Sequence, residues 1–276
     1  MHVGIAAIWR SVTSADGTRI SVLSAGDGPG IVIVPGAGRA ADDYSRLAAH
    51  LETRFSVHAI DRRGRGQSDP QGDAYCIERE IEDLSEVLEA TGSRLVFGHS
   101  YGGLIGLEAA RVLPIDRLAV WEPAVSLSGS FPAAAVGPFA EAVAQGRYDM
   151  AQAMVVKAVI GRPYEALPLG AIRVLCALYN WGTRGPVPPT LVTTMPLELA
   201  EIVRLDSDGL RYADVSAQAL LLAGANSRAF LTSPLRELAR IIPHAEAREL
   251  TGLAHMAPDV QAPARVAGLL SAFFSA

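Results

Sequence analysis

The sequence is poor in cysteine, in long apolar runs and in clustered positive charge. Its two cysteines, Cys76 and Cys176, lie far apart and form no Cys-x-x-Cys pair. This excludes a disulfide framework and a cysteine-based zinc cluster, and it favours a reducing compartment. No segment reaches the about 18 uninterrupted apolar residues of a membrane span, and the first residues, MHVGIAAIWR, lack the basic start of a signal peptide. We therefore expect a cytoplasmic protein with no metal and no membrane partner.

Charge and composition further narrow the class of protein to which this chain can belong. The formal net charge is −5, and the basic residues are scattered apart from Arg62, Arg63 and Arg65. A nucleic-acid partner would require a basic stripe, so this pattern argues against one. Hydrophobic residues make up 50% of the chain and charged residues 19%, as in ordinary globular proteins. A chain of 276 residues can bury a sizeable core as one large domain, or as one domain with an insertion.

The first part of the chain alternates β-rich runs with helical spacing. The Asp16-Gly17 pair predicts a hairpin, because Asp-Gly supplies the positive φ that a tight turn needs. Its strands are expected at residues 12–13 and 19–23. Further strands are expected at 31–34, 56–60, 94–97 and 117–121, and helices at 43–51, 78–90 and 104–112. Strands that alternate with helices indicate an α/β fold with a mostly parallel, doubly wound sheet.

The pattern changes near residue 123. From there to about 213 the chain has helical spacing interrupted by Pro and Gly clusters, and strand-like runs return at 219–223 and 247–250. The sequence therefore predicts an α/β core formed by residues 1–123 and 213–276, split by a helical insertion at 124–212. Helices of the insertion are expected at 139–143, 148–160, 169–181 and 191–205.

The segment Gly98-His-Ser-Tyr-Gly102 places Ser100 between two glycines. A Gly-x-Ser-x-Gly match alone is weak, because glycine-rich turns can contain serine by chance. Here it follows a strand candidate and precedes a helix candidate, the setting in which a nucleophilic serine takes unfavourable backbone angles. The two glycines avoid a clash across such a sharp turn. We therefore predict that Ser100 is a nucleophile.

With these residues the chain resembles the α/β-hydrolase-fold family, most specifically over residues 31–123 and 219–258. Residues 61–69, DRRGRGQSD, are similar to the family's D-x-R-G-x-G-x-S segment. A solvated basic loop is the alternative for that segment. The resemblance favours a structural turn near the site instead, and it implies an α/β-hydrolase fold whose inserted helices act as a cap, or lid.

Attack of a serine on a carbonyl requires two N–H donors for the developing negative oxygen. The resemblance implies that Tyr101 supplies one of them. The family's second donor comes from a His-Gly-x-Gly loop, which here reads Pro35-Gly36-Ala37-Gly38. We expect the second donor to be the N–H of Ala37. The missing histidine removes a loop-orienting hydrogen bond, and a plain glycine-rich turn is the alternative.

A serine nucleophile needs a base, and histidine suits that role at neutral pH. Among six histidines, His255 lies in a loop after the last strand candidate, where the family places its base. The family's usual acid position is occupied by Ser227, which carries no charge. Glu122 follows the strand 117–121 and is our predicted acid, because a buried carboxylate needs a partner. The weaker candidates are Asp206, Asp208 and Asp214.

The insertion resembles a lid, and its residues Met195 and Leu199 could contribute to an apolar ceiling. Aromatic or Met residues at helical spacing are more often simply core residues. As a set, the lid composition predicts an apolar or aromatic small-molecule substrate rather than a phosphorylated one. The residues that we predict to bind substrate are Gly36, Trp121, Met154, Tyr179 and Trp181.

The resemblance therefore implies a serine hydrolase, with Ser100, His255 and Glu122 as catalytic residues and no cofactor. The expected reaction is cleavage of a carboxylic ester or lactone. Alternatives on the same fold are thioester or carbon–carbon bond hydrolysis and non-hydrolytic tailoring. A non-catalytic ligand receptor is a further alternative, favoured by the missing aspartate, whereas a purely structural module would not need the glycine-flanked serine. Relatives with an aspartate nucleophile are disfavoured by Ser100.

Overall fold

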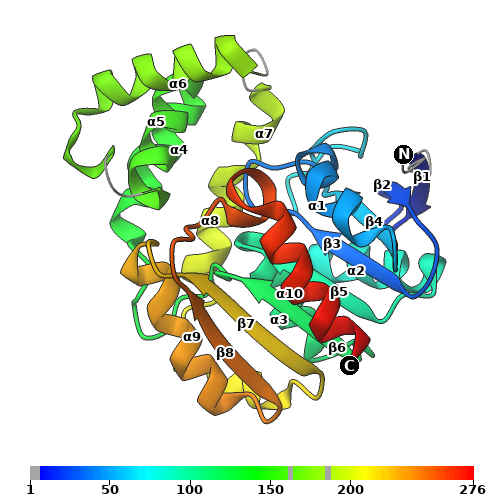
Figure 1. Cartoon of the computed structure of the whole chain (residues 1–276). Helices are drawn as coiled ribbons and strands as arrows, with labels where there is room; N and C mark the ends of the chain where they lie inside the picture. Colours follow the sequence, from blue (N-terminus) through cyan, green and yellow to red (C-terminus); the bar gives the residue numbers. More distant parts are fainter. Residues whose placement is uncertain (1–6, 161–163, 184–187) are drawn as a thin grey trace.

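The computed structural model describes residues 7–160, 164–183 and 188–276, and for residues 181–183 only the backbone. The described residues form one eight-stranded sheet in the order β1-β2-β4-β3-β5-β6-β7-β8 (Figure 1). The strands are β1 (Ile8–Thr13), β2 (Arg19–Ala25), β3 (Gly30–Val34), β4 (Ser56–Asp61), β5 (Leu95–His99), β6 (Arg117–Trp121), β7 (Gln218–Gly224) and β8 (Ala245–Leu250).

The sheet is mostly parallel, as the sequence predicts. Strands β1 and β2 form the expected antiparallel hairpin around Asp16-Gly17, and β2 also runs antiparallel to β4. All other neighbouring strands are parallel. The carboxyl ends of β3, β5, β6 and β7 therefore lie along one edge of the sheet, where polar side chains from distant parts of the chain can meet.

Helices cover both faces of the sheet. On one face lie α1 (Ser45–Leu51) and α10 (Pro263–Ser275), which are adjacent in Figure 1. The other face packs against α2 (Ile77–Thr91), α3 (Tyr101–Ala110) and α9 (Ala229–Ile241). Alternate residues of β3 serve the two faces: Val32 and Val34 join the α2/α3 side, and Ile31 and Ile33 join the α1/α10 side. A strand buried on both faces must be apolar throughout, which explains this continuous run.

Between β6 and β7 the described chain is mainly helical. It forms α4 (Val136–Ala144), α5 (Tyr148–Val159), α6 (Leu169–Thr183), α7 (Pro189–Thr193) and α8 (Met195–Arg204). These helices gather beyond the carboxyl edge of the sheet, with α6 farthest from it and α8 against it (Figure 1). No helix in the described ranges is long and apolar enough to cross a membrane.

The single helix expected at 191–205 is wrong. The structure divides it into α7 and α8 at Thr194. Pro196 lies in the first turn of α8 and has no N–H to donate to the carbonyl of Val192, so the hydrogen-bonded ladder stops there. The sequence pattern missed this break because apolar residues keep helical spacing across it.

Candidate active site

Ser100 occupies a strained turn between β5 and α3. Its backbone angles are φ 54° and ψ −117°, which side-chain-bearing residues rarely adopt. A Cβ on Gly98 would lie 2.3 Å from the carbonyl oxygen of Gly102, and a Cβ on Gly102 would lie 2.0 Å from that of Val34. Neither position accepts a side chain, so both glycines are needed to form the turn. The Ser100 side chain is held at the sheet edge and is only half-buried.

Glu122 lies directly beyond β6, and its side chain is fully buried. The backbone of Ser100 donates to the carbonyl of Trp121 at 2.9 Å, which aligns the ends of β5 and β6. The Glu122 carboxylate accepts the backbone N–H of Gly224 at 2.7 Å, and its other oxygen lies 2.7 Å from Nδ1 of His255. The structure therefore brings together a carboxylate and an imidazole that are 133 residues apart in the chain.

A second histidine, His99, supports the first. Its Nε2 bonds to the carbonyl oxygen of His255 at 3.0 Å, and the two rings lie 4.8 Å apart between centroids. Its Nδ1 lies 2.7 Å from the hydroxyl of Tyr44, which also accepts the N–H of Gly36 at 3.1 Å. Burial, and then the nearby His255, holds the pKa of His99 well below its usual value, so its ring is neutral. His99, which adjoins Ser100, thus links the loop of His255 to the loop at 35–38.

The loop at 35–38 lies against the serine. A Cβ on Gly36 would lie 3.1 Å from Cβ of Ser100, so this position must remain small. Ala37 is half-buried and packs both on the core and on an apolar cluster of the inserted helices. Above it, the sulfur of Met195 would lie 3.3 Å from a Cβ on Gly38. The loop is therefore enclosed between the sheet edge and α8.

The residues predicted to bind substrate differ in how deeply they are buried and in what they pack against. Trp121 is fully buried and packs in the core on the α1/α10 side. Met154 is half-buried and packs on the apolar cluster that contains Met195. Tyr179 on α6 (Leu169–Thr183) is 54% exposed. The side chain of Trp181 lies outside the described residues.

The other acid candidates have partners elsewhere. Asp206 accepts hydrogen bonds from the Ser126 hydroxyl and, at 2.9 Å, from the N–H of Gly129. Asp208 accepts the N–H of Leu210 at 3.0 Å. Asp214 is exposed and lies 3.9 Å from Arg111. Within the described parts of the chain, Glu122 is the carboxylate that contacts the His255 ring.

Sequence reasoning missed a further ion pair beside the site. Asp259 is buried and lies 2.8 Å from Nε of Arg39, which directly follows the 35–38 loop. Burial raises the pKa of Asp259, and Arg39 and His255 oppose that rise. In the sequence, the one feature that could have pointed to Asp259 is its four-residue spacing from His255. Among residues 7–160, 164–183 and 188–276, no cluster of three or more His, Cys, Asp or Glu side chains could hold a metal ion.

The three arginines of the DRRGRGQSD segment are buried, so a solvated basic loop is wrong and a structural turn is correct. Arg62, Arg63 and Arg65 are each at most 3% exposed. Arg63 pairs with Asp83 at 2.7 Å and with Asp16 at 3.1 Å, whereas Arg62 and Arg65 donate to carbonyls of the 35–38 loop. Composition alone could not distinguish these cases, because the compensating carboxylates lie far away in the sequence.

Comparison with known proteins agrees with this architecture. The model of the alpha/beta hydrolase family matches residues 31–269. A 2-(acetamidomethylene)succinate hydrolase from Mesorhizobium japonicum is 23% identical over 244 residues, covering 87% of this chain and 86% of that protein. An alpha/beta hydrolase structure from Sphaerobacter thermophilus is 31% identical with a TM-score of 0.78, covering 96% of this chain and 100% of that one. The esterase RhEst1 from a Rhodococcus species is 20% identical with a TM-score of 0.72, covering 97% and 98%.

Proposed function

Because the chain belongs to the alpha/beta hydrolase family and is a hydrolase with a small-molecule substrate, we propose that it cleaves a carboxylic ester or lactone by acyl transfer to Ser100. The observation that carries this proposal is the 2.7 Å contact between His255 Nδ1 and the buried Glu122, at the sheet edge that presents the strained Ser100. A fixed nucleophile, an imidazole and a buried carboxylate are the parts that serine acyl transfer requires.

The tautomer of His255 follows from its partner. Glu122 accepts a hydrogen bond from the N–H at Nδ1, so the proton stays on Nδ1 and Nε2 is the nitrogen that takes the proton of Ser100. The serine oxygen then attacks the substrate carbonyl, and the N–H groups of Ala37 and Tyr101 bind the oxygen that becomes negative. His255 returns its proton to the leaving alcohol. Water attacks the acyl-serine with His255 as base, the acid is released, and Ser100 regains its proton.

The surroundings of the proposed site support an apolar substrate portion. Ala37 packs on a cluster of inserted helices whose members include Phe139, Val192 and Met195. Because such a surface offers few polar groups, it favours an apolar or aromatic acyl or alcohol group over a phosphorylated one. We propose that residues 124–212 act as the cap of this site.

Substitution of the three proposed catalytic residues tests the mechanism. Ser100→Ala and His255→Ala should each lower kcat on a p-nitrophenyl ester by at least about a thousandfold. Glu122→Gln should lower it by roughly a hundredfold or more, because the amide cannot stabilise the imidazolium charge. Asp206→Asn is the matched control and should keep normal turnover. Normal kcat in Glu122→Gln, with a loss in Asp206→Asn, would move the acid to Asp206.

A covalent probe separates an enzyme from a receptor. A fluorophosphonate should label Ser100 in the native protein, as located by mass spectrometry, and should not label Ser100→Ala. A protein that binds a small apolar ligand yet resists labelling would instead be a non-catalytic receptor.

A further inference from the structure

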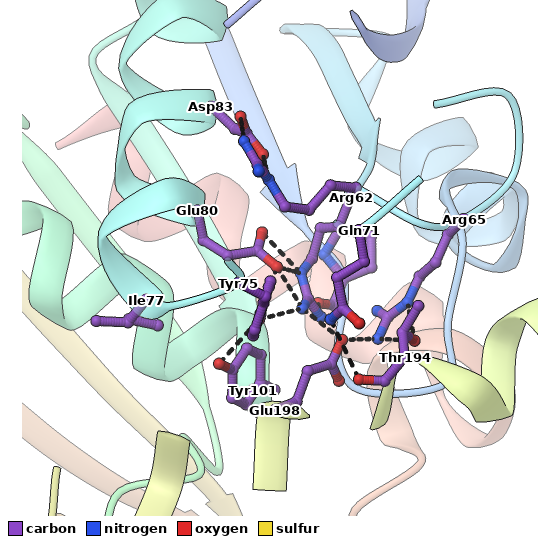
Figure 2. Close-up of polar contacts among 12 residues, drawn as sticks. Arg62, Arg65, Gln71, Tyr75, Ile77, Glu80, Asp83, Tyr101, Thr194 and Glu198 are labelled. Atoms are coloured by element: carbon purple, nitrogen blue, oxygen red, sulfur yellow. Dashed lines mark hydrogen bonds and ion pairs between the residues drawn. The ribbon is translucent and has the colours of Figure 1, made fainter. Parts of the chain in front are cut away.

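Four fully buried charges lie directly beneath the 35–38 loop, and the proposed mechanism gives them no role. Arg62 and Arg65 follow β4, Glu80 comes from α2 and Glu198 from α8, and each is at most 1% exposed (Figure 2). Burial opposes ionisation of Arg62, but Glu198 and Glu80 outweigh it and raise the pKa of Arg62 well above its usual value. Two guanidinium groups thus face two carboxylates. Removing four charged groups from water costs free energy, so we looked for a function that this cluster serves.

Both arginines hold the backbone of the loop. Nη1 of Arg65 donates to the carbonyl of Gly36 at 2.9 Å, and Nη1 of Arg62 donates to that of Pro35 at 3.3 Å. The carbonyl of Gly36 and the N–H of Ala37 belong to one planar peptide group and point in opposite directions. A hydrogen bond that fixes this carbonyl therefore also fixes where the N–H of Ala37 points.

Helix α8 determines where the Arg65 guanidinium lies. One oxygen of Glu198 accepts Nη2 of Arg62 at 2.8 Å and also Nη2 of Arg65. The hydroxyl of Thr194, at the start of the same helix, lies 3.2 Å from Nε and 3.1 Å from Nη2 of Arg65. Figure 2 shows Glu198 and Thr194 meeting the two arginines from the α8 side. The guanidinium of Arg65 is therefore fixed between the loop and the inserted helix.

The same cluster supports the other proposed donor residue. The guanidinium of Arg62 lies 4.7 Å from the ring centre of Tyr101. The Tyr101 hydroxyl lies 2.9 Å from that of Tyr75, which donates to Glu80 at 2.9 Å (Figure 2). Both residues whose N–H groups would bind the oxyanion are thus attached to one ionic cluster.

We propose that Arg65 and Glu198 are positioning residues for the oxyanion site: Arg65 orients the Gly36–Ala37 peptide, and Glu198 on α8 fixes Arg65. This inference rests on the proposed function. It also gives a substitute for the loop-orienting histidine that the family's usual loop has and this chain lacks. The hydrogen bond comes instead from the carbonyl side of the peptide, and the inserted helices become part of the catalytic geometry.

Substitution of Glu198 tests the proposal most directly. Glu198→Gln should lower kcat on the p-nitrophenyl ester by about tenfold to a hundredfold, less than complete loss of an oxyanion donor. KM should change less than about twofold, because the transition state and not the ground state uses the displaced N–H. The inhibition constant of a trifluoromethyl ketone, which places a negative oxygen in the same position, should rise by the same factor as kcat falls.

Glu201 offers a matched control on the same helix. It also joins α8 to the core, through the N–H of Ile77 at 2.7 Å, but it contacts neither loop arginine. Glu201→Gln should keep kcat and ketone affinity normal. If Glu201→Gln and Glu198→Gln lower kcat equally, Glu198 only anchors the helix and the proposal is wrong. The same holds if ketone affinity stays normal in Glu198→Gln.

Milder variants cover the case in which Glu198→Gln does not fold. Thr194→Val removes, at constant shape, the hydroxyl that accepts from Nε and Nη2 of Arg65, and it should lower kcat severalfold without changing KM. Arg65→Met should lower kcat more than Arg65→Lys, because lysine keeps a donor for the Gly36 carbonyl. Equal activity of Arg65→Met and the native protein would overturn the proposal.

Fluorophosphonate labelling distinguishes failure of the proposed function from failure of this inference. An unlabelled native Ser100 overturns both proposals, whereas a labelled Ser100 with unaffected variants overturns only the positioning role of Arg65 and Glu198.

Discussion

Single glycines at the carboxyl ends of β5 and β7 are constrained by backbone contact more than by side-chain chemistry. Gly98, Gly102 and Gly224 each lack room for a Cβ because a backbone carbonyl oxygen lies within 2.3 Å of its position. Ser100 itself stays in an unfavourable conformation, whose cost is about 1–3 kcal/mol. The surrounding contacts must offset that cost, so the turn should respond sharply to small added volume.

Gly102→Ala is the simplest test of this crowding. The new methyl group would meet the carbonyl oxygen of Val34, and we expect a loss of at least about 2 kcal/mol in the free energy of unfolding. The measurement is urea unfolding followed by circular dichroism. Gly268→Ala in α10 is the matched control, since open space surrounds that position and alanine favours a helix by about 0.5–1 kcal/mol. Equal stability of the two variants would contradict the crowding.

At the scale of elements, the antiparallel pair formed by β2 and β4 contains a buried histidine. His58 on β4 bonds through Nδ1 to the Ser24 hydroxyl at 2.9 Å and through Nε2 to the Ser56 hydroxyl at 3.2 Å. Burial, with a smaller effect of Arg10, lowers the pKa of His58 from 6.5 to about 4. Protonation therefore disfavours the folded state.

This lowered pKa predicts a pH dependence of stability. Between pH 6.5 and about 4 the unfolded chain binds a proton at His58 that the folded protein does not bind. The stabilisation is therefore fully present above pH 6.5 and declines as the pH falls toward 4. His58→Asn should show a smaller decline in the free energy of unfolding between pH 7 and pH 5. Parallel pH profiles for the two proteins would refute the assignment.

At the scale of the whole molecule, the insertion and the core are not separate packing units. Ile202 of α8, Leu205 directly after that helix, and Tyr212 lie in the same apolar cluster as residues of α2, α3 and α9. Part of the 124–212 span is thus core by packing, although α4, α5 and α6 lie beyond the sheet edge (Figure 1). We expect the α8 region to unfold together with the sheet.

Ile202→Ala tests this cooperativity. Because Ile202 is 2% exposed, its truncation should cost about 2–5 kcal/mol. The loss should appear as a shift of the main thermal transition in calorimetry. Val203→Ala on the same helix is the control, since Val203 is 38% exposed and should change little. A new early transition in Ile202→Ala, with the main one unmoved, would show that the insertion unfolds independently.

Much of the fold could be predicted because its signals are local. The β-branched run of β3 and the helical spacing of α2 reflect burial within each segment, so periodicity is enough to identify them. Glu122 could be proposed because a carboxylate after a buried parallel strand needs a partner at the sheet edge. The role of His99 could not be predicted, because it depends on Tyr44 and on the carbonyl of His255, which lies 156 residues away.

By itself, the sequence determined the order of strands and helices along the chain, the mostly parallel character of the sheet, and the glycines that the turn at Ser100 requires. These follow from local periodicity and from steric limits within a few residues. Only the tertiary structure decided that Arg62 and Arg65 are buried and that Glu80 and Glu198 balance their charge. Such features depend on which distant groups meet, since a buried guanidinium is tolerated only where carboxylates from other segments surround it.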